Sequence, residues 1–123
     1  MKPEDGNRRR VAAEMVRLAR ELMASQIAKT IAEQMGGVRR LKMMLGATVM
    51  ALSGGKGLGI KWPNRQRSKG NYVEITLRGD DTYDMEFFNV SGRNRKSVKT
   101  YRGVYFDQLV DLFEKQTGWY LRM

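Results

Sequence analysis

The chain has 123 residues, a formal net charge of +10, and neither cysteine nor histidine. This length suits one domain, and the missing residue types exclude disulfides, thiolate nucleophiles, histidine general bases and the usual zinc sites. The N-terminus has no apolar run behind its charges, and the longest uncharged window, residues 43–55, is too short and glycine-rich to span a bilayer. We therefore expect a soluble, intracellular protein.

A long N-terminal helix is predicted by apolar residues that recur every three or four positions. They are Val11, Met15, Leu18 and Leu22. The phase shifts after Ser25, so residues 1–25 are either part of a single domain 1–123 or a separate arginine-rich helical extension. Arg8, Arg9 and Arg10 stand where the helix dipole disfavours positive charge. We interpret them as a phosphate-binding arm, the alternative being a solvated helix end.

A short second helix and two strands are predicted next. Residues 38–45 have a helical pattern, and residues 47–52 and 58–62 are typical of strands. The glycine-rich residues 53–57 between them include a lysine, as phosphate-binding loops do. They lack the spacing of either nucleotide motif, and a strand rather than a helix is expected to follow. A flexible hairpin turn is the better interpretation.

Residues 71–90, NYVEITLRGDDTYDMEFFNV, predict the central β-hairpin, because apolar and polar side chains alternate on both sides of a Gly-Asp-Asp turn. One register places Arg78 opposite Asp84. Another places Glu74 opposite Glu86. We prefer the first register, because like charges directly opposite each other are destabilising.

The last part of the chain predicts a strand over residues 97–102 and a helix over residues 106–116. The apolar stripe of that helix includes Leu109, Leu112 and Phe113, and we expect it to cover the central hairpin. The predicted fold is an α+β domain. It has an antiparallel sheet of about five strands, a long N-terminal helix, a short second helix and a C-terminal helix.

Charge is sorted along the chain. Residues 50–70 and residues 91–103 each hold five basic side chains and no acid. Residues 71–90 hold one arginine and five acids, a net charge of −4. We therefore expect two basic loops, residues 64–70 and 91–96, to flank the sheet and to favour an anionic partner.

Three aromatic residues complete a candidate nucleic-acid surface. Trp62, Tyr72 and Phe88 are expected near the basic loops, and exposed rings there would stack on single-stranded bases. The alternative is that these rings fill the core. Phe88 tests this best, because strand alternation aims it away from Phe87. The expected contacts are Arg8, Arg9, Arg10, Trp62, Arg65, Arg67, Lys69, Tyr72, Phe88, Arg93, Arg95 and Lys96.

Clustered carboxylates at Asp80, Asp81, Asp84 and Glu86 are the best candidates for magnesium-dependent nuclease chemistry. Their spacing matches no nuclease motif, and aspartates in a hairpin usually serve the turn. We therefore expect no catalytic residue, no metal site and no cofactor.

Four stretches of the chain carry a family resemblance. They are IAEQMGG, LGA, ITLRGDDTYDMEFFNV and KTYRGVYFDQLVDLFEKQTGWYLRM. They resemble small uncharacterised proteins carried by bacteriophages and mobile elements. The match covers most of the chain beyond residue 25 and departs from the shared pattern at Asp80 and Asp81. The resemblance implies a phage or mobile-element origin and a place in the cytoplasm of a bacterial host, and it assigns no activity.

The sequence supports two functional interpretations. The first is a non-catalytic accessory protein that binds DNA or RNA through its phosphates. The second is a protein-interaction module, such as a phage-encoded inhibitor of a host defence or regulatory protein, or a minor virion component. In that case the basic faces would meet an acidic host protein, and the helical stripe from Val11 to Leu22 would form a homodimer or partner contact.

Overall fold

The computed structural model describes residues 26–63 and 69–121. Most of the predicted N-terminal helix lies outside the described residues, and only residues 26–34 of it are described as helical. The elements that follow are α2 (Val38–Leu45), β1 (Thr48–Ala51), β2 (Gly57–Lys61), β3 (Tyr72–Leu77), β4 (Tyr83–Ser91), β5 (Asn94–Val104), the 3₁₀ turn η2 (Phe106–Gln108) and α3 (Leu109–Thr117).

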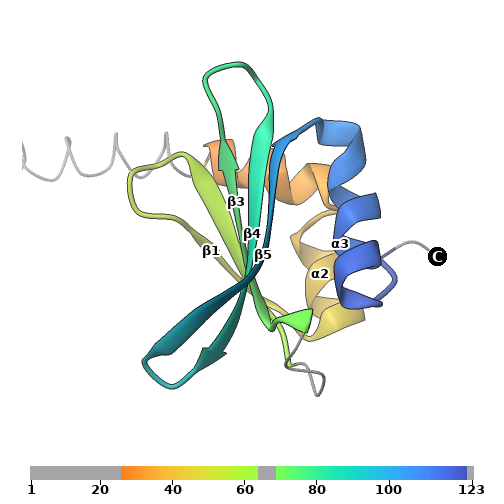
Figure 1. Ribbon diagram of the computed structural model, residues 1–123. Coiled ribbons are helices and arrows are strands. Elements are labelled where there is room, and N and C mark those ends of the chain that lie inside the picture. Colours follow the sequence, from red (N-terminus) through yellow and green to blue (C-terminus); the bar gives the residue numbers. More distant parts are fainter. Residues whose placement is uncertain (1–25, 64–68, 122–123) are drawn as a thin grey trace, which may run out of the picture.

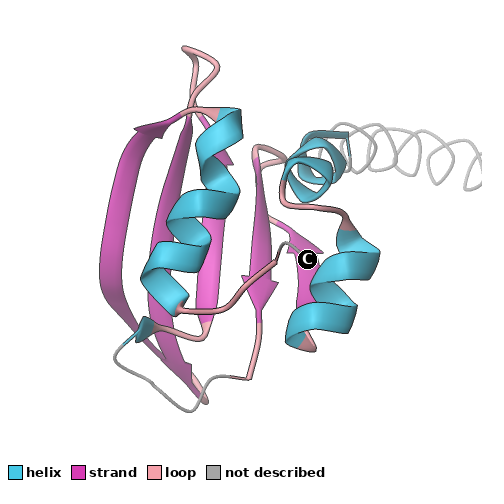
Figure 2. Cartoon of the chain, turned by 90° about the vertical axis from the view of Figure 1, so that its right-hand side faces the viewer, coloured by secondary structure: helices cyan, strands magenta, loops and turns pink. Residues whose placement is uncertain are grey.

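The five strands form one antiparallel sheet in chain order, from β1 at one edge to β5 at the other. The helices lie on one face of this sheet and leave the other face open (Figures 1 and 2). The predicted α+β class, the five-stranded antiparallel sheet, the short second helix and the C-terminal helix are therefore confirmed. In the parts of the chain that the structure describes, no helix has the length and apolar character needed to cross a bilayer.

The core lies between the helices and the sheet. Alternate residues of β3 and β4 face it, including Ile75 and Phe87, and α3 contributes Phe113. The Phe113 ring lies 6.1 Å from Phe87 and 5.1 Å from Trp62 between ring centroids. Burying each of these large side chains contributes about 1.5–3 kcal/mol. As predicted, α3 covers the central hairpin. Trp62 belongs to this core.

The preferred register of the central hairpin is wrong. The structure pairs Glu74 with Glu86, and Leu77 with Tyr83 as the last pair before the turn. The preferred register would have placed Tyr83 opposite Gly79 at the turn, whereas the observed register places it opposite Leu77, where the residue is 5% exposed. Arg78 still reaches Asp84 across the diagonal, at 3.1 Å between Nη1 and Oδ1. The ion pair that favoured the other register therefore survives in this one.

The turn of this hairpin depends on its aspartates. Asp80 Oδ1 accepts hydrogen bonds from the Thr82 hydroxyl at 2.6 Å and from the Thr82 backbone N–H at 3.2 Å. These bonds hold the pKa of the Asp80 carboxyl below its usual value. Asp81 has φ 63°, a left-handed conformation that aspartate adopts more readily than most residues. The carboxylates at this position serve the turn.

Residues 91–96 do not form the predicted loop. β4 continues to Ser91 and β5 begins at Asn94, so only Gly92 and Arg93 connect them. Gly92 has φ 59°, which a two-residue hairpin turn of type II′ requires at its first position. The expected strand over residues 97–102 is accordingly longer at both ends.

Asn71 marks the point where this hairpin leaves the sheet. Its side-chain amide accepts the Val90 N–H at 2.7 Å and donates to the Val90 carbonyl at 2.9 Å, in place of a further residue of β3. Beyond that point β4 and β5 pair only with each other. We call residues 89–96 the β4–β5 arm, and it projects away from the helices (Figure 1).

Replacing Gly57 with alanine should destabilise the sheet. A Cβ there would lie 2.5 Å from the Ile75 carbonyl oxygen and 2.7 Å from Leu52 Cδ1, so the backbone of β3 would have to move. We expect Gly57→Ala to lower the free energy of unfolding by about 1–3 kcal/mol, measured by urea denaturation. Gly79→Ala is the control, because nothing lies within 4 Å of its new Cβ. Equal stability of the two variants would contradict this packing.

Candidate nucleic-acid interface

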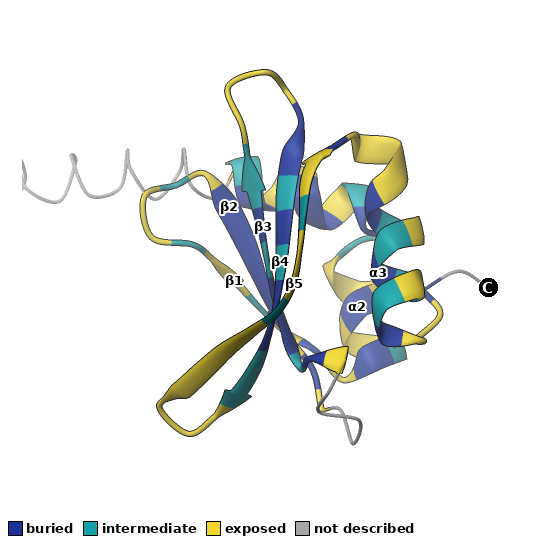
Figure 3. Cartoon of the chain, in the orientation of Figure 1, coloured by how far each residue is buried: buried dark blue, intermediate teal, exposed yellow. Residues whose placement is uncertain are grey.

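Four basic side chains are exposed on the β4–β5 arm and along β5. They are Arg93, Lys96, Lys99 and Arg102. No acidic residue occurs between Glu86 and Asp107, and among the described residues none of these four cations forms an ion pair. Figure 3 shows the arm exposed along β5 and intermediate in burial along the end of β4. The described part of the chain thus presents four exposed cations along the arm and β5.

A β-bulge places two of these lysines on the same face. Lys96 pairs with Asn89 and Lys99 with Phe87, which leaves Val98 without a partner. In a regular strand, residues three apart face opposite sides of the sheet. The extra residue Val98 shifts this alternation by one position. Lys96 and Lys99 therefore both point to the face of the sheet on which the helices lie.

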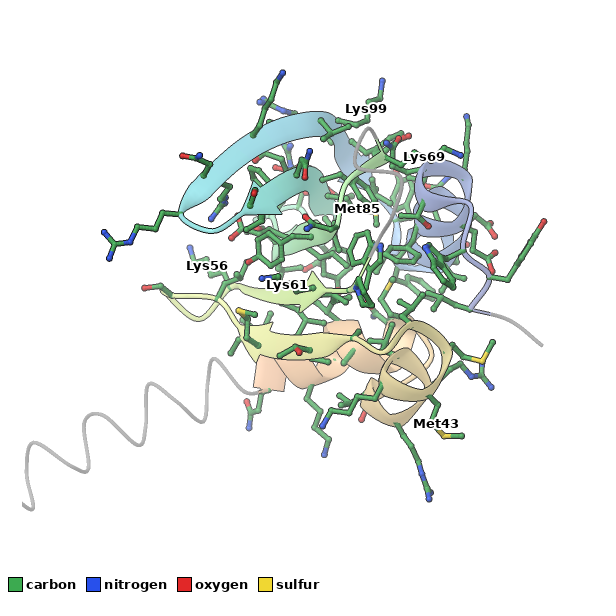
Figure 4. All side chains as sticks on the ribbon, turned by 90° about the horizontal axis from the view of Figure 1, so that it is seen from below. Met43, Lys56, Lys61, Lys69, Met85 and Lys99 are labelled. Atoms are coloured by element: carbon green, nitrogen blue, oxygen red, sulfur yellow. The ribbon has the colours of Figure 1, made fainter. Side chains whose placement is uncertain are left out.

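Lys69, another predicted contact, lies near the C-terminal end of α3. A Cβ built on Gly118, which ends that helix, would be 3.6 Å from Lys69 Nζ. Lys99 Nζ lies 5.5 Å from the centroid of the Tyr101 ring, and the Tyr101 hydroxyl donates to Gln116 of α3 at 3.0 Å. Both lysines therefore lie towards this helix end (Figure 4), where the helix dipole favours positive charge.

Arg95 is not a free phosphate contact. Its guanidinium lies over the Phe88 ring at 4.0 Å and the Tyr72 ring at 5.5 Å, and its Nη2 meets Glu74 Oε1 at 2.6 Å. The Tyr72 hydroxyl donates to the other oxygen of Glu74 at 2.9 Å. We call these four residues the Arg95 clasp. It joins the base of the arm to the open face of the sheet.

The predicted stacking surface is not exposed. Trp62 is 1% exposed and lies in the core, while Tyr72 and Phe88 are 7% and 6% exposed. Phe88 does point away from Phe87, as strand alternation predicts, but the clasp covers it. The same open face carries Glu74, Asp84 and Glu86, whose charges would repel a phosphate backbone. Single-strand stacking on this face is therefore disfavoured.

The other predicted contacts cannot be placed. Arg8, Arg9, Arg10, Arg65 and Arg67 lie outside the described residues. The proposed homodimer stripe from Val11 to Leu22 also lies outside them. Of the twelve predicted contacts, the structure thus brings only Arg93 and Lys96 together on the β4–β5 arm as exposed cations without an ion-pair partner among the described residues.

Three carboxylates of the central hairpin, those of Glu74, Asp80 and Asp84, are engaged with neighbouring groups. Asp84 accepts from Arg78 at 3.1 Å and from the Gly103 backbone N–H at 3.3 Å. Glu74 belongs to the clasp. Within residues 26–63 and 69–121, no three acidic side chains gather as ligands for a metal ion.

Sequence reasoning left Lys99 and Arg102 out of the site. Both belong to residues 91–103, which contain no acid. Residues 97–102 were predicted as a strand, and only the basic residues of the predicted loop at 91–96 were assigned to the binding surface. The Ser-Gly-Arg-Asn sequence at residues 91–94, between two runs of strand-forming residues, is the signal that would have predicted a hairpin there.

Comparisons with protein-family models, curated proteins and solved structures gave no match. The resemblance to small phage and mobile-element proteins stays a prediction. Function is accordingly inferred from the residues and from the geometry of the arm.

The Arg95 clasp should contribute measurably to stability. We expect Arg95→Ala to lower the free energy of unfolding by about 1–2 kcal/mol, because it removes the ring contacts and the Glu74 ion pair. A double-mutant cycle with Glu74→Gln should give a coupling energy of about 0.5–1 kcal/mol. The control Arg102→Ala, at an exposed and unpaired site, should stay within about 0.5 kcal/mol of wild type. Zero coupling would show that the pair contributes nothing.

Tyr72 should make stability fall at alkaline pH. Burial, followed by the hydrogen bond to Glu74, raises the pKa of the Tyr72 hydroxyl from its usual value near 10 to about 12. Above pH 10 the unfolded state loses this proton first, so the free energy of unfolding decreases until about pH 12. Tyr72→Phe should show a shallower decrease in urea denaturation over this range. Parallel curves for variant and wild type would contradict the assignment.

Proposed function

We propose that this protein is a non-catalytic nucleic-acid-binding protein that contacts phosphates through the β4–β5 arm and the adjoining part of β5. One observation carries the proposal. Arg93, Lys96, Lys99 and Arg102 are exposed and unpaired within the described chain, on a segment without any acid. Such a row of cations matches the spaced negative charges of a nucleic-acid backbone.

Protection of an edge strand is the competing explanation. β5 is an edge strand, and charged side chains and bulges on such strands prevent pairing with other chains. Lysine is the charged residue most used on such edges, and glutamate also serves there. Edge protection therefore explains why β5 is charged and irregular, but it does not explain why all of its charges are positive. A phosphate-binding role explains why the charges of β5 are positive.

The expected binding is mainly electrostatic. Each phosphate contact would steepen the fall of log K with log salt by a slope of about 0.9 on duplex DNA. The accessory role, the phage or mobile-element origin and the place in a bacterial cytoplasm belong to the same proposal and rest on the sequence resemblance.

A second candidate function, contact with a host protein, is favoured by a different surface. Tyr105 and Phe106 are 61% and 60% exposed, and Phe106 borders a cavity of about 420 Å³ that Met35, Val110 and Leu121 also line. Exposed aromatic residues beside a cavity are typical of protein contact sites. This surface lies at the other end of β5 from the arm tip, so the two functions can be separated by substitution.

Charge reversal on the arm should weaken nucleic-acid binding. We expect Lys96→Glu with Lys99→Glu, at the end of the arm and just beyond it, to lower the affinity and to reduce the magnitude of the salt slope by about 1.8, because two phosphate contacts are lost. The measurement is fluorescence anisotropy of labelled duplex DNA, single-stranded DNA and RNA over a salt series.

The control is Arg39→Glu with Lys29→Glu, which changes the net charge equally at exposed positions in the helical layer. It should keep a salt slope close to that of wild type. An equal loss of affinity in both double variants would mean that net charge, rather than the arm, governs binding. Absence of binding by the wild type at low salt would overturn the proposed function.

A further inference from the structure

We propose that the β4–β5 arm enters the major groove of double-stranded DNA. Arg93 and Asn94 at its tip meet the base edges, while Lys96 and Lys99 meet the phosphate backbone. This inference rests on the proposed nucleic-acid binding and names duplex DNA as the ligand. Its tests separate the two claims.

The shape of the arm fits this groove. Asn71 ends the pairing with β3 at Val90, so the tip projects as a two-stranded ribbon of residues 91–94. The two strand positions from Val90 to the turn at Gly92 span about 7 Å. The major groove of B-DNA is about 8.5 Å deep and about 12 Å wide, and it admits a two-stranded ribbon. The major groove of A-form RNA is too narrow for side chains to read.

The tip carries the side chains that read bases. Arginine donates two hydrogen bonds to guanine O6 and N7, and asparagine pairs with adenine N6 and N7. Arg93 and Asn94 are both exposed at the tip, beside Gly92, which has no side chain to obstruct a close approach. Lys96 and Lys99 lie further along β5 on one face, as backbone contacts flanking an inserted tip require.

Single strands fit this surface less well. Recognition of single strands relies on exposed aromatic rings, and the rings nearest the arm are buried under Arg95. The carboxylates of Glu74, Asp84 and Glu86 on the open face repel a backbone laid across it. The exposed rings of Tyr105 and Phe106 lie beyond the opposite end of β5. A duplex that contacts the tip of the arm does not lie across the acidic open face of the sheet.

The arm is oriented before it binds. The Arg95 clasp ties its base to β3, and the Asn71 amide fixes its exit from the sheet. A ribbon held in one pose loses less conformational entropy on binding than a flexible loop does. Arg95 is therefore a positioning residue in this proposal, and it makes no contact with DNA.

The first test compares three ligands of the same base sequence with the full chain: a short DNA duplex, its single strand and the corresponding RNA duplex. We expect the DNA duplex to bind at least about ten-fold more tightly than the other two. Tighter binding of the single strand or of duplex RNA would overturn the groove inference and leave nucleic-acid binding standing. Absence of binding to all three would overturn both.

The second test locates the arm by dimethyl sulfate footprinting on the DNA duplex at saturating protein. The wild type should protect guanine N7 in the major groove and leave adenine N3 in the minor groove reactive. Arg93→Ala with Asn94→Ala should lose N7 protection, whereas Lys96→Ala with Lys99→Ala should weaken affinity and keep N7 protection in the complexes that form. All four substitutions are at exposed positions, and thermal unfolding checks their folding. Protection of N3 instead of N7, or N7 protection that survives loss of Arg93 and Asn94, would contradict the proposal.

Discussion

The contact of Arg95 with Phe88 and Glu74 is the interaction on which the register of the central hairpin and the direction of the arm depend. The positive charge of Arg95 offsets the negative charge of Glu74 and so reduces its repulsion with Glu86. The register that sets these two carboxylates opposite each other is therefore stable. Arg95 covers Phe88 and Tyr72, which would otherwise form an apolar patch on the open face. It also joins β5 to β3 across β4, which sets the direction in which the arm leaves the sheet.

This contact divides the basic side chains of residues 91–103 into two roles. Arg95 is paired with Glu74, which balances its charge, while Arg93, Lys96, Lys99 and Arg102 form no ion pair among the described residues. The open face beside the clasp keeps its carboxylates, so positive potential is concentrated on the arm and along β5 instead of spreading over the sheet. The proposed binding surface is therefore a ribbon and an edge, and it is not a flat platform of rings.

Much of the fold follows from local pattern. Alternation in residues 71–90 predicted both central strands, and the stripe at Leu109 and Phe113 predicted the helix that covers them. The register was missed because Arg95, which offsets the repulsion at Glu74, lies 21 positions away on another strand. Trp62 was misplaced for a related reason. Its burial depends on Phe113, and no pattern near residue 62 contains that contact.

The most direct test of this account is a map of the amide signals that change when duplex DNA is added to isotope-labelled protein, recorded by two-dimensional NMR at moderate salt. The account predicts changes concentrated at residues 91–99, with the clasp residues shifting less and α2 not at all. Changes centred on the helical layer or on the carboxylates of the open face would contradict it.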